Sequence, residues 1–409
     1  MMRNLYKSGL ALLGVAALLP VLGCGGSSSS GGPVPYDLTA ASILVDLDGD
    51  GRLDPVNAVS TYGYGPPHSG FLSLRFQNAS PLGSFRDPVR LSAGTDPYAI
   101  AFGDLNGDGR PDLVVANTQT TPGAIGSNTI TVILSGATPG TFQPAQSLSL
   151  GNRDPLDVAL GDLNHDGLAD IAVASRGGDS VQVFFQISAG TFASPITAAL
   201  GAEPTALTIA DLNADGYMDL AVTTQANVSS VLLQNTSSAG TFGTPLNLSV
   251  GNAPVAVRSA DINGDGYLDL AVVNSGSPYG GLSLLLQDAS IPATFQFQAT
   301  ANYDTGDDYA SALAIGDLNG DGRPEVVVTN AGAPGYPGSV AVFAQDPANL
   351  GHLLSPELYQ GYYGPTSVAI GELNGDGHPD LLIADGDPSV RFQDPAQPGF
   401  FNRPVWLKH

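Results

Sequence analysis

The stretch Asp104-Leu105-Asn106-Gly107-Asp108-Gly109-Arg110-Pro111-Asp112 decides how this chain folds. Oxygen-bearing side chains stand at its positions 1, 3, 5 and 9, an apolar residue stands at position 2, and glycine stands at position 6. The pattern occurs seven times, and its copies begin at Asp46, Asp104, Asp162, Asp211, Asp261, Asp317 and Glu372. A pattern that returns at such regular intervals indicates a fold built from repeated units.

Short apolar strands are predicted on both sides of each copy. Tyr98–Phe102 precedes the copy quoted above, and Leu113–Ala116 follows it as an apolar run without alternation. Such a run is typical of a strand that is covered on both faces. A third strand such as Ile130–Leu134 comes next, and Gly-Thr-Phe with a nearby proline, as in Gly190–Pro195, begins a fourth.

Four short strands per unit without helical periodicity are typical of a propeller blade, and seven units lie within the usual range of four to eight blades. We therefore predict an all-β fold, a seven-bladed β-propeller of four-stranded antiparallel blades, over residues 36–409. Neither end of the chain supplies a strand that clearly completes a split blade. One possibility is that Pro404–Leu407 lies beside the first blade.

The loops are predicted to bind calcium, because Ca²⁺ takes six to eight oxygen ligands. Positions 1, 3, 5 and 9 offer side chains, position 7 offers its carbonyl, and Gly at position 6 permits the positive φ of the turn. Up to seven ions are expected. The predicted ligands are Asp46, Asp48, Asp50, Asp54, Asp104, Asn106, Asp108, Asp112, Asp162, Asn164, Asp166, Asp170, Asp211, Asn213, Asp215, Asp219, Asp261, Asn263, Asp265, Asp269, Asp317, Asn319, Asp321, Glu325, Glu372, Asn374, Asp376 and Asp380.

The loop residues allow two other interpretations. An EF-hand shares positions 1, 3, 5 and 6 but needs Glu at position 12 and flanking helices, whereas position 12 here is a strand residue such as Val115. Asx-rich turns without metal stay open as the simpler alternative. Among the seven loops, the longer Glu372 at the crowded first position fits calcium least well.

The units resemble the FG-GAP/VCBS repeat family, whose best known members are the integrin α-subunit propellers. The resemblance covers residues 36–409 and implies a propeller with calcium in its hairpin loops. It does not imply integrin function, since no inserted domain or heterodimer partner is evident, and we expect a monomer.

The formal net charge of -24 has a local origin, because the loop positions hold 22 of the 38 acidic residues. Such a chain repels nucleic acid and anionic lipid, so neither is an expected partner. One cysteine, Cys24, excludes an intramolecular disulfide.

The N-terminal residues are predicted to direct and anchor the protein. Residues 1–23 combine two basic residues with an apolar run too short to span a bilayer, which indicates a signal peptide. Val21-Leu22-Gly23-Cys24 resembles a bacterial lipobox, which implies lipidation of Cys24 and an extracytoplasmic protein held at a bacterial membrane, at the cell surface or the outer membrane. A plain secretory signal is the alternative. Residues 24–35 read as a flexible Gly/Ser tether.

Tyrosines gather in the loops expected on the face opposite the calcium loops, and Tyr62, Tyr64, Tyr362 and Tyr363 are the predicted ligand-binding residues. Tyrosine with glycine makes an adaptable contact surface. No nucleophile elbow, cysteine nucleophile or histidine cluster predicts catalysis. The expected function is a surface-anchored binding or adhesion module for a protein or glycan. The alternative is a carbohydrate-active enzyme, such as a polysaccharide lyase, with a site at the channel mouth.

Overall fold

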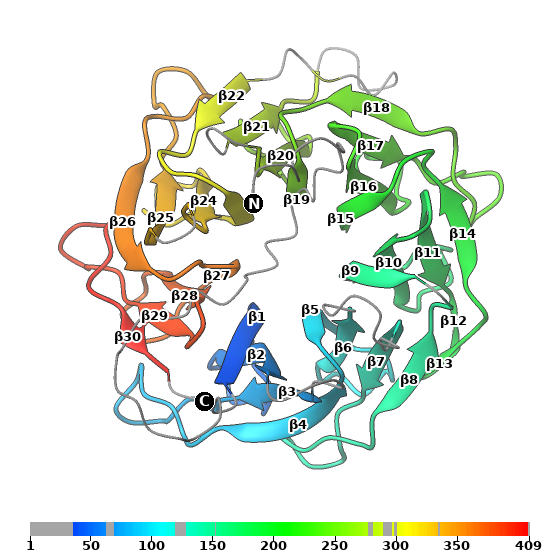
Figure 1. Ribbon diagram of the computed structural model, residues 1–409, viewed down its shortest axis with the longest axis horizontal. Coiled ribbons are helices and arrows are strands. Elements are labelled where there is room, and N and C mark those ends of the chain that lie inside the picture. Colours follow the sequence, from blue (N-terminus) through cyan, green and yellow to red (C-terminus); the bar gives the residue numbers. More distant parts are fainter. Residues whose placement is uncertain are drawn as a thin grey trace, which may run out of the picture.

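The computed structural model describes residues 36–62, 69–118, 128–151, 153–276, 281–288, 297, 301–333 and 336–407. In these residues seven four-stranded antiparallel sheets are arranged as blades around a central axis (Figure 1). The predicted all-β, seven-bladed propeller is therefore confirmed. The described residues form no helix, so they include none that could span a membrane. The predicted signal peptide, Cys24 and the tether lie outside them.

Each blade is formed by consecutive strands, from the axis outward. The innermost strands are β1 (Tyr36–Val45), β5 (Pro97–Gly103), β9 (Asp154–Gly161), β15 (Pro204–Ala210), β19 (Pro254–Ala260), β23 (Ala310–Gly316) and β27 (Ser367–Gly371). The second strands are β2 (Asp54–Tyr62), β6 (Asp112–Asn117), β10 (Asp170–Arg176), β16 (Asp219–Thr224), β20 (Asp269–Asn274), β24 (Glu325–Asn330) and β28 (Asp380–Ala384).

The two outer positions of each blade follow the same order. The third strands are β3 (Ser69–Leu74), β7 (Thr129–Ile133), β11 (Ser180–Phe184), β17 (Val228–Leu232), β21 (Gly281–Leu285), β25 (Gly338–Phe343) and β29 (Ser389–Arg391). The outermost strands are β4 (Val89–Gly94), β8 (Gln146–Ser149), β14 (Ile196–Ala199), β18 (Leu246–Ser249), β22 (Ala301–Asp304), β26 (Glu357–Tyr362) and β30 (Val405–Trp406). A short pair, β12 (Gln186–Ser188) and β13 (Thr191–Phe192), extends the third blade.

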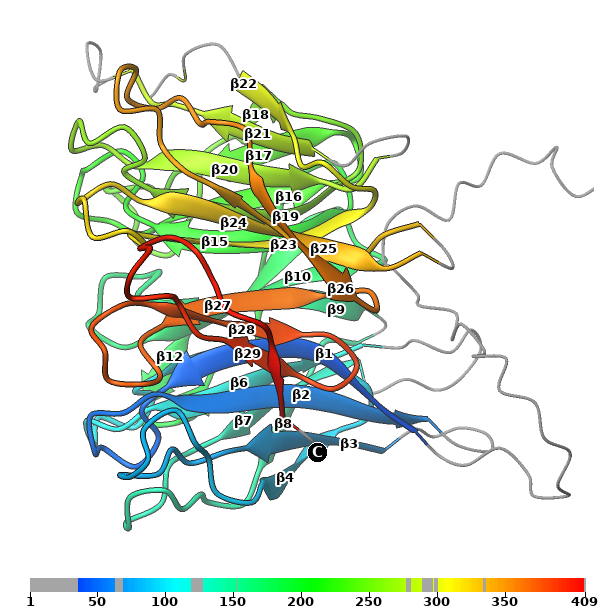
Figure 2. The same ribbon diagram turned by 90° about the vertical axis from the view of Figure 1, so that its left-hand side faces the viewer.

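The nine-residue loops join each innermost strand to the second strand of the same blade, and their position 9 is the first residue of that second strand. Because successive hairpins alternate between faces, all seven loops lie on one face of the ring (Figure 2). The hairpins between third and fourth strands share this face. The crossings between blades, and those connections between second and third strands that the structure describes, such as 225–227, lie on the other.

The hydrophobic core lies between blades rather than within one. The second strands are buried along their whole length, for example Asp112–Asn117 and Asp219–Thr224. Each apolar cluster combines residues of two neighbouring blades, as when Leu72 and Leu74 of the first blade pack with Leu113 of the second. This explains why these strands are apolar without alternation.

The ring closes by contact between the seventh and first blades, and each blade is built from one continuous stretch of chain. Leu44 of β1 packs with Leu373 and Leu382 of the seventh blade. The backbone N–H of Thr39 donates to the carbonyl of Gly386 at 3.2 Å. The predicted place of Pro404–Leu407 beside the first blade is confirmed for Val405–Leu407, which line a cavity together with first-blade residues.

The Gly-Thr-Phe motif does not begin the fourth strand, as predicted, but precedes it. Its phenylalanine forms an isolated bridge with a residue just after the third strand, as in Gln234 with Phe242, and the fourth strand starts after the following proline. Proline has no N–H to donate and ends the bridge, so the chain bends before it pairs again.

A glutamine that follows the third strand ties each blade to the one before it. The side-chain amide of Gln234 donates to the carbonyl of Leu163, at position 2 of the preceding loop, at 2.7 Å. Six of the seven junctions in the described chain carry this bond, donated by Gln77, Gln186, Gln234, Gln287, Gln345 and Gln393. At the second blade Ser135 takes the place of the glutamine, and the N–H of Gly140 donates to the carbonyl of Leu47 instead.

We expect Gln234→Ala to destabilise the propeller by about 1–3 kcal/mol, because the buried carbonyl of Leu163 loses its only side-chain donor. Denaturant unfolding with an unchanged m-value measures this. Gln225→Ala removes an exposed glutamine of the same blade and should change stability by less than about 0.5 kcal/mol. Equal stabilities of the two variants would contradict a role for the interblade bond.

Candidate metal centre

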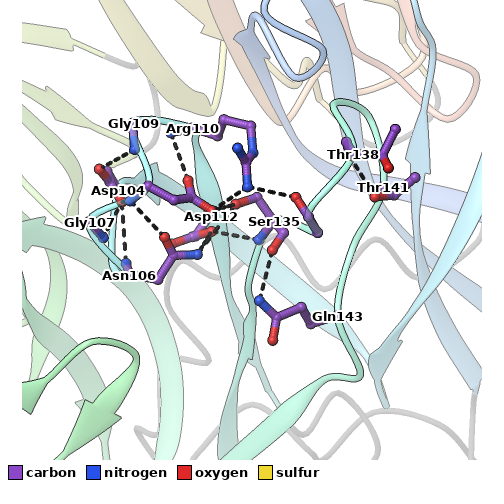
Figure 3. A network of polar contacts seen from close by, with 12 residues as sticks. Asp104, Asn106, Gly107, Gly109, Arg110, Asp112, Ser135, Thr138, Thr141 and Gln143 are labelled. Atoms are coloured by element: carbon purple, nitrogen blue, oxygen red, sulfur yellow. Dashed lines mark hydrogen bonds and ion pairs between the residues drawn. The ribbon is translucent and has the colours of Figure 1, made fainter.

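Each loop is closed by the carboxylate at position 1, which accepts hydrogen bonds from the backbone of its own turn. In the second loop Asp104 accepts from Gly107 at 2.7 Å and from Gly109 at 2.8 Å (Figure 3). Gly109 has a φ of 78°, so the predicted positive φ at position 6 is confirmed. In the seventh loop Glu372 accepts from Gly375 at 2.6 Å and also from Gly377, so the longer side chain closes its turn in the same way.

The carboxylate at position 9 is buried and faces away from the loop surface. Asp219 has no exposed area; one of its oxygens accepts from the backbone of Leu212 at 3.1 Å, and the other accepts from the backbone of Gln234 at 2.7 Å. The first of these bonds is present in all seven loops. The second is present in six of them, and at Glu325 the side chain of Asn319 donates in its place.

Burial raises the pKa of these position-9 carboxyls, and the two backbone donors oppose the rise only in part. The pKa of Asp54, Asp219 and Asp380 rises to about 7, and that of Asp170 and Asp269 to about 6. The pKa of Glu325 rises to about 7 for the same reason. A cation beside these groups would therefore stabilise the folded state by favouring their charged form.

The first loop differs from the other six in the residue at position 3, which is aspartate instead of asparagine. In five of the six loops where it is asparagine, its amide donates to a carboxylate of the same loop, as Asn213 does to Asp215 at 2.9 Å. The first loop has Asp48 instead, which has no such donor. One oxygen of Asp48 is buried without a hydrogen-bond partner, and burial and the charge of Asp50 raise the pKa of Asp48.

The first loop is therefore the one whose residues fit a calcium ion best. Oxygens of Asp46, Asp48 and Asp50 lie within 4.8 Å of one another, which makes this the one cluster of its kind among the described residues. Arg52 pairs with Asp50, and Arg86 lies 3.9 Å from Asp48, so the charge is balanced only in part. Carboxylate oxygens gathered in this way are the donor set that Ca²⁺ prefers.

The loops are also covered by the neighbouring blade. A Cβ placed on Gly140, in the outer hairpin of the second blade, would lie 3.4 Å from Asp48. The same relation joins Gly240 to Asn164 at 3.4 Å. In these two loops the residue at position 3 therefore lies against the outer hairpin of the next blade. The loop sequence alone does not reveal this contact.

The four tyrosines predicted to bind a ligand differ in their exposure to solvent, where the structure describes their side chains. Tyr64 lies outside the described residues, and Tyr62 ends β2 without a described side chain. Tyr362 is fully buried, where it accepts a hydrogen bond from Arg391 and meets the ring of Trp406, so its predicted place on a ligand surface is wrong. Tyr363 is 84% exposed, and Tyr336, which is not among the predicted ligand-binding residues, is 74% exposed.

Two features of the loops were missed although the sequence carries a signal for them. The recurring glutamine after the third strand stands at a fixed place in six units. Position 4 of the loop also needs a positive φ, which explains why it is usually glycine. His165 and Ala214 adopt a φ of 60° and 56° at this position, a conformation that costs non-glycine residues about 1–2 kcal/mol.

Comparison with known proteins gives a consistent result. A family model described as "FG-GAP-like repeat" matches residues 46–115, 162–222, 211–272 and 261–328, which is more than half of the chain. No curated protein matches the sequence.

Solved propeller structures resemble the whole ring. A candidate 6-phosphogluconolactonase of Bacteroides fragilis is 16% identical, with a TM-score of 0.58, over 91% of this chain and 95% of that one. A lectin of Agrocybe aegerita that recognises non-reducing terminal N-acetylglucosamine is 17% identical, with a TM-score of 0.52, over 91% and 94%. The periplasmic gluconolactonase of Pseudomonas aeruginosa is 19% identical, with a TM-score of 0.52, over 78% and 87%. At these identities the likeness concerns the fold alone.

The raised pKa values predict an unusual pH dependence for the metal-free protein. A carboxyl such as Asp219 has a pKa of about 3.9 when unfolded and about 7 when folded. Its contribution to stability is therefore fully present below about pH 4 and is lost as the pH rises through about 7. We expect the melting temperature in chelator to fall between pH 5 and pH 8. A melting temperature that rises over this interval would contradict the burial of these groups.

Calcium titration should single out the first loop. We expect Asp48→Asn to weaken the tightest calcium site by about tenfold or more, because it removes one of three clustered carboxylates. Isothermal titration calorimetry measures this. Glu357→Gln, which neutralises an exposed carboxylate on β26, serves as the control and should leave the titration unchanged. An unaltered tightest site in Asp48→Asn would exclude the first loop.

Proposed function

The chain belongs to the FG-GAP-like repeat family, and from that premise we propose that it is a calcium-stabilised β-propeller that binds a protein or glycan at a bacterial surface. The observation that carries this proposal is a group of exposed tyrosines around one blade. Binding residues concentrate on loops that a rigid scaffold holds in place.

The exposed tyrosines belong to the sixth blade and its two crossings. Tyr309 precedes β23, Tyr336 lies between β24 and β25, and Tyr363 follows β26. Their exposed fractions are 37%, 74% and 84%. These segments belong to the face opposite the nine-residue loops, where Figure 2 shows the crossings between blades.

Backbone hydrogen bonds hold this tyrosine group in position. The N–H of Ala331 donates to the carbonyl of Tyr309 at 2.8 Å. Both oxygens of the Asp385 carboxylate accept from the backbone of Tyr363, at 2.8 and 2.9 Å. Rings that are exposed on a fixed backbone lose little conformational entropy on binding, which favours a recognition surface.

In this proposal calcium serves the scaffold rather than the ligand. The predicted metal ligands lie on one face and the exposed tyrosines lie on the other. A bound ion would balance the clustered carboxylates and join two strands of a blade. Lipidation at Cys24 and the tether at 24–35 would hold the propeller outside the cytoplasm, as a monomer, with no affinity for nucleic acid.

Thermal melting tests the calcium part of this proposal. Removal of calcium with a chelator should lower the melting temperature near pH 8, because clustered and buried carboxylates then lack a counterion. Excess calcium should restore it. An unchanged midpoint would show that the loops are turns without metal.

A glycan array and a pull-down from cell-surface extracts, combined with a sugar-release assay, test the binding part. We expect wild-type protein to retain a ligand without release, and Tyr336→Ala with Tyr363→Ala to weaken it by about tenfold or more. Ile187→Ala, which removes an exposed apolar side chain on the opposite face, is the control. Release of reducing sugar would favour the carbohydrate-active enzyme. Unchanged binding by the double variant would refute the site.

A further inference from the structure

A cavity lies at the seam where the seventh blade meets the first. Its volume is about 420 Å³, and its walls include Arg75 and Phe85 of the first blade with Trp406 and Leu407 of the seventh. Figure 1 places β30 here, next to the connection that leads into β4. The lining of this cavity includes none of the carboxylates of the nine-residue loops and none of the exposed tyrosines of the sixth blade.

Arg75 occupies a position that is apolar core in most blades. It stands two residues before the recurring glutamine, and the equivalent residues are almost fully buried in five blades: Ile133, Phe184, Leu232, Leu285 and Phe343. Arg75 is itself only 9% exposed. A charged side chain at a core position needs compensating partners.

Those partners are missing for Arg75 within the described residues. The guanidinium Nε is buried without a hydrogen-bond partner, and the one hydrogen bond of the side chain, from NH1 to the carbonyl of Arg86, is 3.5 Å long. It forms no ion pair within 4.0 Å, although the charge of Asp87 acts on it from nearby. Burial accordingly lowers the pKa of the Arg75 guanidinium.

The seventh blade shows how an arginine at this position is satisfied. Arg391 is the equivalent residue, and its guanidinium lies 5.1 Å from the ring centres of Tyr359 and of Tyr362. Its Nε donates to the hydroxyl of Tyr362. The backbone N–H of Phe401 donates to the hydroxyl of Tyr359 at 3.1 Å. The two tyrosine rings therefore lie against the guanidinium of Arg391, and their hydroxyls accept from the two donors, Arg391 Nε and the N–H of Phe401.

At the seam the two corresponding donors are the guanidinium of Arg75 and the backbone N–H of Phe85, and neither has a tyrosine hydroxyl as its acceptor. Leu407 stands at the place of Tyr359, since Val405 pairs with Val390 as Glu357 pairs with Val342. Phe85 is the equivalent of Phe401, and within the described residues its backbone N–H has no hydrogen-bond partner. The cavity thus offers an arginine, a backbone donor and aromatic walls.

We propose that the seam cavity binds a phenol group, with its ring against the guanidinium of Arg75 and its oxygen accepting from Arg75 and from the N–H of Phe85. Asp87, on the cavity wall, can accept the phenol hydrogen. Because the charge of Asp87 acts on the same space, a neutral phenol suits the site better than a second carboxylate. The volume is ample, since a cavity of about 150 Å³ admits benzene.

The phenol can come from a tyrosine side chain of a polypeptide or from a free phenolic compound. N-acetyl-tyrosinamide represents the first source and phenol itself the second. N-acetyl-phenylalaninamide differs from the first probe only by the hydroxyl, so it measures the hydrogen bonds alone.

Trp406 gives a direct readout, because it is the only tryptophan in the chain and lines the cavity. Its fluorescence, excited where tyrosine does not absorb, should change in a saturable manner with either phenol. The phenylalanine probe should bind about tenfold more weakly, the change expected for a lost hydrogen bond of about 1.4 kcal/mol. Tighter binding of one phenol than the other identifies the source.

Arg75→Leu gives the first blade the leucine that the fourth and fifth blades have at this position, Leu232 and Leu285. The variant should therefore melt normally. It should bind the phenol at least about tenfold more weakly. Arg90→Leu removes an exposed arginine of the same blade as the matched control and should bind as wild type. Leu407→Tyr, at the place of Tyr359, should supply an acceptor for the N–H of Phe85 and weaken phenol binding by about tenfold or more.

Three results would overturn the proposal. These are the absence of any saturable fluorescence change in the wild type, equal affinity for the tyrosine and phenylalanine probes, and wild-type affinity in Arg75→Leu.

Discussion

The structure depends on a buried carboxylate at the start of every second strand. Burial of a charge is costly unless hydrogen bonds compensate it, and here two backbone N–H groups converge on each carboxylate in almost every blade. One N–H comes from position 2 of the loop and the other from the residue that follows the third strand, as with Leu212 and Gln234 on Asp219. The carboxylate therefore ties the loop and the end of the third strand to the start of the second strand, at the edge of the strand pairing.

The glutamine that meets this carboxylate extends the connection from blade to blade. Its backbone is bound to its own blade and its side chain to the preceding loop, so the seven loops form a continuous ring of hydrogen bonds interrupted only where Ser135 replaces the glutamine. Hydrogen bonds of this kind are directional, whereas the apolar contacts between blades are not. The ring of loops thereby sets the angle between neighbouring blades, which leaves the opposite face free to vary in sequence.

Much of this architecture could be predicted from the sequence because it is repeated. Seven copies of one loop, each followed by an apolar strand such as Leu113–Ala116, identify the blades and their number. The different roles of the carboxylates within one loop could not be predicted in the same way. Asp46 and Asp54 look alike in the sequence, yet one closes an exposed turn and the other is buried, because only the third strand, distant in sequence, reaches Asp54. Tyr362 and Tyr363 are neighbours with opposite exposure, because Tyr362 ends β26 and Tyr363 lies in the crossing that follows it.

Hydrogen exchange of the metal-free protein tests most directly whether the buried carboxylates organise the ring. The account predicts that the backbone amides of Leu105, Leu212 and Gln234, which donate to Asp112 and Asp219, exchange as slowly as those of the core strands β6 and β16. These three residues are buried but lie outside the strands, so slow exchange of their amides requires the bonds to Asp112 and Asp219 to stay closed. Exchange of these amides at the rate of the solvent-exposed turn at Gln225–Asn227 would contradict the account.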